Sequence, residues 1–226
     1  MKIIRFEEIN STNEYAKNIN ENAVVIAKRQ TGGKGTKGRS FSSNEGGVYL
    51  TKRVFYENFP AKDAFLVMAR TAVAVCKTLE KFAIEPKIKW ANDVFVEGRK
   101  ICGILIENVF SGSKISSSII GVGLNVNNSL PEELKDIATS MKKVKGETLD
   151  FEKVESALLT YLDEEFSMDE YLKRVAYLNE EVTLVVGDKE YLAVPLRVEE
   201  DGGLVVKIGQ EERKVFSGEV SLKVKR

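Results

Sequence analysis

A segment rich in glycine and basic residues, Gln30–Arg39, places the strongest constraint on how this chain can fold. It contains four glycines and three cations, and the apolar run Val24–Ala27 leads almost directly into it. Glycines let the backbone turn and approach a ligand closely. Free N–H groups beside Lys or Arg form a concave site for phosphate or carboxylate. The segment therefore predicts a buried strand followed by an anion-binding loop.

The charge around this loop supports the prediction and leaves an alternative open. Between Asn22 and Asn44 there are five basic residues and no acidic residue, although the whole chain has 34 of each. A solvated basic hairpin or a weak nucleic-acid-binding patch would have the same local composition. The glycine spacing differs from Gly-x-x-x-x-Gly-Lys-Ser/Thr, which argues against a P-loop nucleotidase.

The residue types that are missing narrow the chemistry. The 226 residues include no histidine, which excludes His-ligated zinc and the Ser-His-Asp and Cys-His catalytic arrangements. The two cysteines, Cys76 and Cys102, have no metal-binding spacing. Zero net charge argues against a general nucleic-acid-binding protein. Since the chain has neither a membrane-length apolar run nor a leader pattern, we expect a cytoplasmic location.

Hydrophobic periodicity predicts an α+β fold. Strands are predicted at Lys2–Phe6, Ala23–Ala27, Gly47–Phe55, Val94–Val96, Lys100–Glu107 and Ile115–Val126. Helices are predicted at Ser11–Ile19, Asp63–Phe82, Phe151–Phe166 and Asp169–Tyr177, the first opened by a capping box of Ser11 and Glu14. After Glu181, short β runs alternate with glycine turns. We expect a mixed sheet packed with helices over residues 1–178 and a small SH3-like β-barrel over residues 179–226.

Two further segments place polar groups where predicted strands begin or end. Asn92 and Asp93 offer an amide and a carboxylate at the start of a hairpin. Lys100 begins an otherwise apolar strand, so its amine either snorkels at the strand edge or points into a site. Gly103, in the middle of that strand, indicates a bulge or the close approach of a ligand. Gly121–Asn127 ends a later strand with more glycine and another amide.

Taken together, these segments resemble the biotin protein ligase family. The family has Ser-Thr-Asn, Gln-Thr-x-Gly-Arg-Gly-Arg-x-Gly-Arg, Lys-Trp-Pro-Asn-Asp, Lys-x-Ala-Gly-Ile-Leu-x-Glu, Gly-x-Gly-x-Asn, Ala-Thr-Ser and Gly-Glu-x-Ser-Leu in this order. The matching segments are Ser11–Asn13, Gln30–Arg39, Lys89–Asp93, Lys100–Glu107, Gly121–Asn127, Ala138–Ser140 and Gly218–Leu222. Seven matches in register over nearly the whole chain make the resemblance specific.

The resemblance implies a class II synthetase-like catalytic domain and a two-step ATP-dependent reaction. The carboxylate of biotin attacks the α-phosphate of ATP, with Mg²⁺, to give biotinyl-5'-AMP and pyrophosphate. A lysine of a biotin carboxyl carrier domain, in a carboxylase or decarboxylase, then displaces AMP. No nucleic acid or membrane is expected as a partner, and the protein would be a monomer or a homodimer. Because only ten residues precede Ser11, we expect a monofunctional ligase without a DNA-binding domain.

The resemblance also implies the site residues. Those implied as catalytic are Lys100, Asp93 and Arg39. Those implied to bind biotin are Ser11, Thr12, Asn13, Gln30, Gly33, Lys34, Lys100 and Gly103. Those implied to bind ATP or the adenylate are Lys34, Gly35, Thr36, Lys37, Arg39, Phe41, Asn92, Asn125 and Ala138. No metal is expected to be held by the protein alone, although Mg²⁺ near Asn125 is compatible with the pattern.

Several of these residues are compatible with more than one role. Lys100 would hold the reacting carboxyl and phosphate oxygens, and Asp93 would orient or deprotonate the incoming lysine. Ser11 can serve both as a helix cap and as a ligand contact. Phe41 would stack on adenine or pack in the core. Thr36 stands where the family commonly has a second arginine, which predicts weaker retention of the adenylate.

Two alternatives to a biotin ligase stay open. A lipoate or octanoate ligase or transferase would share the catalytic fold and the adenylate chemistry. A non-catalytic nucleic-acid-binding protein would use the basic loop and the small barrel. The zero net charge and the few aromatic residues near the loop favour the ligase.

Overall fold

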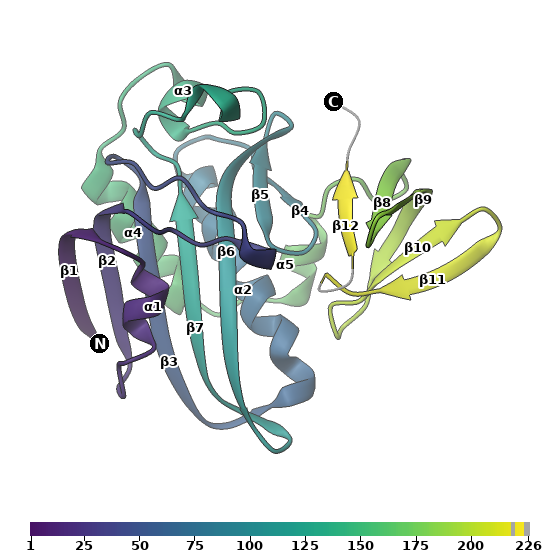
Figure 1. The fold of residues 1–226 in the computed structure, drawn as a ribbon, viewed down its shortest axis with the longest axis horizontal. Coiled ribbons are helices and arrows are strands. Elements are labelled where there is room, and N and C mark those ends of the chain that lie inside the picture. Colours follow the sequence, from purple (N-terminus) through teal and green to yellow (C-terminus); the bar gives the residue numbers. More distant parts are fainter. Residues whose placement is uncertain (218–219, 224–226) are drawn as a thin grey trace.

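A mixed seven-stranded sheet holds most of the chain in this computed structural model, which describes residues 1–217 and 220–223 (Figure 1). The strand order is β1-β2-β3-β7-β6-β5-β4, and only the β1–β2 pair is parallel. The strands are β1 (Lys2–Ile9), β2 (Ala23–Gln30), β3 (Val48–Pro60), β4 (Lys87–Lys89), β5 (Asp93–Val96), β6 (Arg99–Ser111) and β7 (Lys114–Leu124).

Helices cover both faces of this sheet. The α-helices are α1 (Thr12–Ala16), α2 (Ala64–Lys81), α3 (Met141–Lys145), α4 (Phe151–Asp163) and α5 (Met168–Leu172). Helices α2 and α4 lie behind the sheet in Figure 1, and α1 lies in front of it. The buried stretch Val48–Arg53 of β3 reflects this double cover, since side chains on both faces of the strand are shielded. Burial of each large apolar side chain contributes about 1.5–3 kcal/mol.

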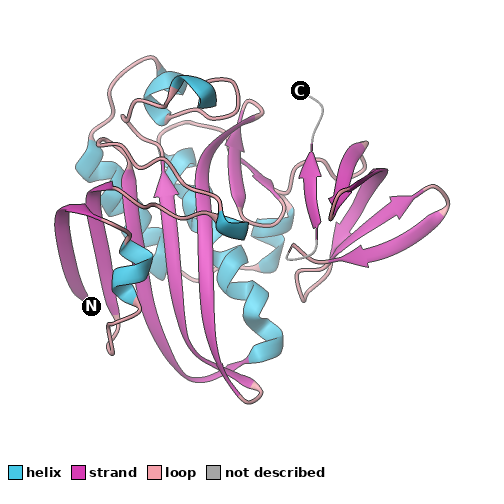
Figure 2. Ribbon diagram, in the orientation of Figure 1, coloured by secondary structure: helices cyan, strands magenta, loops and turns pink. Residues whose placement is uncertain are grey.

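The second sheet is antiparallel and five-stranded, in the order β11-β10-β9-β8-β12. Its strands are β8 (Val182–Val186), β9 (Lys189–Val198), β10 (Leu204–Ile208), β11 (Glu211–Val215) and β12 (Val220–Lys223). Figure 2 shows that this part of the chain is strand and turn, whereas the part before it contains both helices and strands. The predicted fold class is confirmed. The domain boundary at residue 178 stays a prediction.

The long predicted elements are confirmed, and two short ones escaped prediction. Helix α2 begins and ends within one residue of the predicted range, because its apolar residues recur at helical spacing over five turns. Strand β4 and helix α3 are too short for a periodic signal. Ser11 caps α1 as predicted, accepting a hydrogen bond from Glu14 N at 3.4 Å. The other half of the capping box is wrong, since the Glu14 carboxylate accepts hydrogen bonds from two lysines instead.

Two buried contacts connect the sheets. Trp90 Nε1 donates a hydrogen bond to the carbonyl of Gly202, in the turn before β10, at 3.0 Å. The same turn packs against Phe65 of α2, because Gly202 has no side chain. Within the described residues, no helix is long and apolar enough to span a membrane. The motif segment Gly218–Leu222 falls partly outside the described residues, which exclude Gly218 and Glu219.

The glycine at this contact provides a stability test. Gly202 and Gly209 both have positive φ, +83° and +61°, but only a Cβ at Gly202 would overlap a side chain, the ring of Phe65. We expect Gly209→Ala to lower the free energy of unfolding by about 1 kcal/mol, the cost of the left-handed conformation. Gly202→Ala should lower it by about 1–3 kcal/mol more, because the ring must move. Urea denaturation of both variants measures the difference, and equal losses would contradict tight packing of Phe65.

Candidate active site

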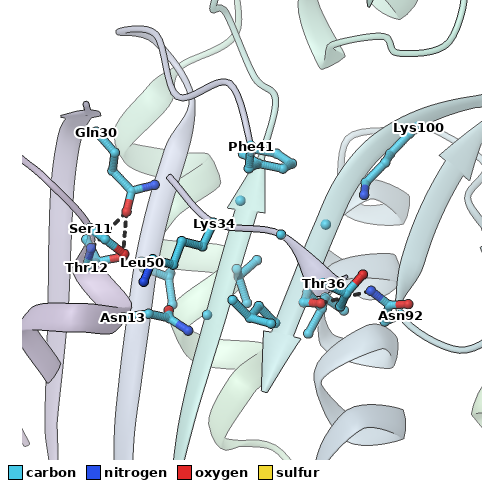
Figure 3. A pocket seen from close by; sticks show the side chains of 17 residues that line it. Ser11, Thr12, Asn13, Gln30, Lys34, Thr36, Phe41, Leu50, Asn92 and Lys100 are labelled. Atoms are coloured by element: carbon cyan, nitrogen blue, oxygen red, sulfur yellow. Dashed lines mark hydrogen bonds between the residues drawn. The ribbon is translucent and has the colours of Figure 1, made fainter. Parts of the chain in front are cut away.

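A cleft of about 450 Å³, open to solvent, lies over the front of the large sheet (Figure 3). It is bounded by the start of α1, the end of β2, the glycine-rich loop, and strands β3, β6 and β7. The sequence-predicted residues that line it are Ser11, Thr12, Asn13, Gln30, Lys34, Gly35, Thr36, Phe41, Asn92, Lys100 and Gly103. The fold thus brings together segments that are distant in the sequence.

The floor of the cleft exists because two glycines meet in the sheet. Gly103 of β6 and Gly123 of β7 are paired in register, and the ring of Phe41 lies over both. A Cβ at Gly123 would lie 2.6 Å from Phe41 Cε1, and one at Gly103 would lie 3.0 Å from Cε2. Any larger residue would therefore fill the cleft or displace the ring. In this structure Phe41 packs on the floor; its stacking on adenine stays a prediction.

The wall opposite Lys100 is a hydrogen-bonded set of neutral polar groups (Figure 3). The backbone N–H of Thr12 donates to Gln30 Oε1 at 2.8 Å, and the Thr12 hydroxyl lies 3.0 Å from the same oxygen. Gln30 Nε2 donates to Ser43 Oγ at 2.9 Å. Thr12 and Ser43 are almost completely buried. The wall is therefore rigid and uncharged, which suits a neutral ligand group that needs hydrogen bonds.

Thr51 supports this wall from below and was missed by sequence reasoning. Its fully buried hydroxyl donates to Asn13 Oδ1 at 2.6 Å and lies 2.8 Å from the hydroxyl of Thr12. Asn13 in turn sits over Gly121, where a Cβ would collide with its amide. No motif includes Thr51, because its role arises from the α1 residues that the fold places over it.

A lysine–carboxylate pair forms the other end of the cleft. Lys100 Nζ lies 2.7 Å from Asp93 Oδ1, and both side chains are mostly buried. The Lys100 amine also lies 5.8 Å from the centre of the Phe41 ring. Backbone bonds hold the strand residue in place: Lys100 N donates to the carbonyl of Ile137, and Thr139 N donates to the carbonyl of Lys100. Lys100 thus faces the cleft, and Asp93 reaches it through this lysine.

The two cysteines do not add a nucleophile to this site. Cys102 is adjacent to Gly103 and fully buried, and burial raises the pKa of its thiol well above the usual range. Burial likewise raises the pKa of Cys76 to about 12. Both thiols therefore stay protonated near neutral pH, and the thiol rather than the reactive thiolate is present.

Three further predicted residues of the loop, Lys37, Arg39 and Gly33, contact other parts of the protein without lining the cleft. Lys37 Nζ donates to the carbonyl of Val220 in β12 at 3.1 Å, which connects the loop to the small sheet. Arg39 folds back on the loop, and its Nη2 donates to Thr36 Oγ1 at 3.0 Å. Gly33 carries the backbone past Phe41 O and Ser43 Oγ, where a Cβ would lie 2.5 and 2.6 Å away. The structure does not bring these three predicted residues into the cleft lining.

Asn125 and Ala138 lie behind the lining rather than in it. Asn125 is buried, and its Nδ2 donates to the carbonyl of Thr139 at 3.1 Å while its Oδ1 accepts from Asn128 at 3.0 Å. The amide thus holds neighbouring segments together, and Mg²⁺ near Asn125 stays a prediction. In the described part of the chain, no three His, Cys, Asp or Glu side chains converge as a metal site. Ala138 forms a β-bridge with Lys100.

The other lining residues come from the central strands, and all but Leu50 lie within the motif segments Lys100–Glu107 and Gly121–Asn127. They are Leu50, Ile104, Leu105, Gly121, Val122 and Gly123. The two glycines belong to the segment that the sequence singled out. The apolar residues are indistinguishable in sequence from core residues of the same strands, so only strand register identifies them.

A chain of charges runs along the rim beside α1. Glu14 lies 2.8 Å from both Lys34 Nζ and Lys17 Nζ, and Lys17 also lies 2.9 Å from Glu107. Hydrogen bonds from Lys17 and Lys34 hold the pKa of Glu14 at about 2, well below its ordinary value. Glu107 further accepts a hydrogen bond from Asn13 Nδ2 at 3.3 Å. The rim is therefore ionised at neutral pH and internally neutralised.

The cleft combines a neutral hydrogen-bonding wall, an apolar floor and a cationic end, which defines a site for an acid with an uncharged polar head. The model of the Biotin/lipoate A/B protein ligase family matches residues 5–125. Bifunctional ligase/repressor BirA of Bacillus subtilis is 30% identical over 219 residues, covering 91% of this chain and 67% of the relative. The chain belongs to the biotin/lipoate A/B protein ligase family.

Two further comparisons agree with this assignment. Biotin--[acetyl-CoA-carboxylase] ligase of Mycobacterium tuberculosis is 25% identical over 215 residues, covering 88% of this chain and 79% of the relative. Among solved structures, biotin protein ligase from Aquifex aeolicus in complex with biotin and ATP matches with a TM-score of 0.83 and 29% identity. That match covers 99% of both chains, so the small second sheet is part of the shared architecture.

The buried hydroxyl of Thr51 gives a prediction for this site. Thr51→Val keeps the shape but removes the donor to Asn13, and we expect the free energy of unfolding to fall by about 1–3 kcal/mol. Thr78→Val is the matched control, because the buried Thr78 hydroxyl bonds only the Ala74 carbonyl of its own helix. Its loss should be about 1 kcal/mol or less. Urea denaturation compares them, and equal losses would contradict the supporting role of Thr51.

Proposed function

We propose that this protein is an ATP-dependent biotin ligase that forms biotinyl-5'-AMP and transfers biotin to a lysine of a biotin carboxyl carrier domain. The observation that carries the proposal is the opposition of the Thr12–Gln30 wall to the Lys100–Asp93 pair across one cleft. The ureido ring of biotin is neutral and needs donors and acceptors, whereas its other end is a carboxylate. The two ends of the cleft match these two requirements.

In the first step, a carboxylate oxygen of biotin attacks the α-phosphorus of ATP and pyrophosphate leaves. The two reactants are anions, so their approach is opposed by charge repulsion. The ammonium of Lys100 would lie between the carboxyl and α-phosphate oxygens, where negative charge accumulates in the transition state. Its orientation toward the cleft, held by Asp93 at 2.7 Å, supports this role.

The glycine-rich loop would bind the phosphate side of the substrates. Thr36 lines the cleft where the family commonly has arginine, and the guanidinium of Arg39 is bonded to the Thr36 hydroxyl. This contact supports Arg39 as the cation on that side. Mg²⁺ would enter with the phosphates of ATP as part of the substrate.

In the second step, the amine of the acceptor lysine attacks the acyl carbon of biotinyl-5'-AMP. A C–N bond forms, the C–O bond to AMP breaks, and the amine loses a proton. The Asp93 carboxylate is the acceptor nearest to Lys100 and would take up that proton or orient the amine. The name of the Mycobacterium tuberculosis relative, biotin--[acetyl-CoA-carboxylase] ligase, points to the carrier domain of a carboxylase as the acceptor. A cytoplasmic location and a monomeric or dimeric state stay predictions.

The experiment that tests the function is exchange of labelled pyrophosphate into Mg–ATP, with biotin, lipoate, octanoate or no acid. We expect exchange with biotin alone. Exchange with lipoate or octanoate would replace biotin by a ligand of the sister enzymes. Silence with every acid, together with salt-dependent binding to nucleic acid, would favour the non-catalytic alternative.

Asp93 provides a test that separates the two steps. We expect Asp93→Asn to slow transfer from preformed biotinyl-5'-AMP to a carrier domain about 100-fold, as loss of a general base does. Pyrophosphate exchange should fall less, because the amide still holds Lys100 by a hydrogen bond. Asp188→Asn, an exposed change in the turn before β9, is the control. Equal losses in both steps would show that Asp93 acts only by positioning Lys100.

A further inference from the structure

The amine of Lys34 points away from the reactive end of the cleft. Figure 3 shows its side chain extending toward α1 and Asn13, on the opposite side from Lys100. There it forms an ion pair with Glu14 at 2.8 Å. Glu14 follows directly after Ser11–Asn13, the three residues of α1 and its cap that line the cleft. The loop cation nearest the neutral wall is therefore already paired with a carboxylate of the protein.

The Glu14 carboxylate has a second lysine partner, and for this reason the ion pair between Glu14 and Lys34 is easily broken. Glu14 is also paired with Lys17 at 2.8 Å, and Lys17 is paired with Glu107 at 2.9 Å. When Lys34 leaves, Glu14 keeps a cation beside it, so no carboxylate is left unpaired at the rim. All four side chains are more than a third exposed, between 35% and 53%. An ion pair with that exposure is weak enough for a ligand anion to replace.

We propose that Glu14 is a positioning residue that stands in for the carboxylate of the substrate. It holds Lys34 against α1 and gives Lys34 up when the anionic end of the acid enters. This inference rests on the proposed function, because it assumes a carboxylic acid as ligand. Lys17 has a separate role. After the exchange it neutralises Glu14, which prevents repulsion between the carboxylate of Glu14 and that of the substrate.

The alternative is that Glu14 holds Lys34 in the position that binds the ligand. The two roles predict opposite signs. If Glu14 competes with the substrate, its removal frees Lys34 and tightens binding of an anionic ligand. If Glu14 supports Lys34, its removal weakens binding. The position of Lys34, turned from Lys100 and toward α1, favours competition.

Titration calorimetry with biotin and with the uncharged biotin amide tests the proposal. We expect Glu14→Gln to lower the Kd for biotin about two- to fivefold and to leave the Kd for the amide unchanged. Glu21→Gln is the matched control, because Glu21 forms a comparable surface pair with Lys2 at 2.8 Å. In a Lys34→Met background, Glu14→Gln should have no effect, because the cation for which the two anions compete is gone.

A second variant has the opposite expected sign. Lys17→Met leaves Lys34 as the cation paired with Glu14, so the lysine is held more tightly and the Kd for biotin should rise about two- to fivefold. Its control is Lys2→Met. Weaker biotin binding in Glu14→Gln, or the same change with the neutral amide, would overturn the proposal. Failure of the wild-type protein to bind biotin would instead overturn the proposed function.

Discussion

The pairing of β6 with β7 is the constraint on which the site depends. Their register places Gly103 opposite Gly123 in the middle of a sheet that is otherwise filled by side chains. The missing side chains leave a shallow floor on which Phe41, and with it the end of the glycine-rich loop, can pack. Lys100 lies three residues before Gly103 on the same strand. A shift of one residue in this register would turn the glycine floor to the opposite face.

Charge in the site is balanced by the protein's own residues. Lys100 is paired with Asp93, and Lys34 is paired with Glu14, so the two lysines that line the cleft each have a carboxylate partner. Such pairing keeps a basic cleft from binding anions indiscriminately, because each ligand must replace an internal partner. It also explains how a chain with zero net charge can present a cationic loop.

Prediction from the sequence succeeded where a signal is either periodic or dense. The 18-residue helix α2 is periodic, and the loop Gln30–Arg39 concentrates glycines and cations in ten positions. Most lining residues of the cleft were therefore predicted. Thr51 was not predicted, because its sequence context does not distinguish it from a threonine in any other buried strand. Arg39 and Lys37 were predicted as ligand contacts, yet here they bond to Thr36 and to Val220.

The sequence by itself determined which chemistry is available. It supplies no histidine, two cysteines without metal-binding spacing, and lysines, carboxylates and amides at the starts and ends of strands, and these favour electrostatic and acid–base roles in catalysis. The tertiary structure alone decided which of these groups meet. Glu14 faces Lys34 rather than its own helix cap because the loop returns over α1, a contact between residues 20 apart. The type of each residue is given by the sequence alone, whereas its contact partners depend on how strands and loops pack.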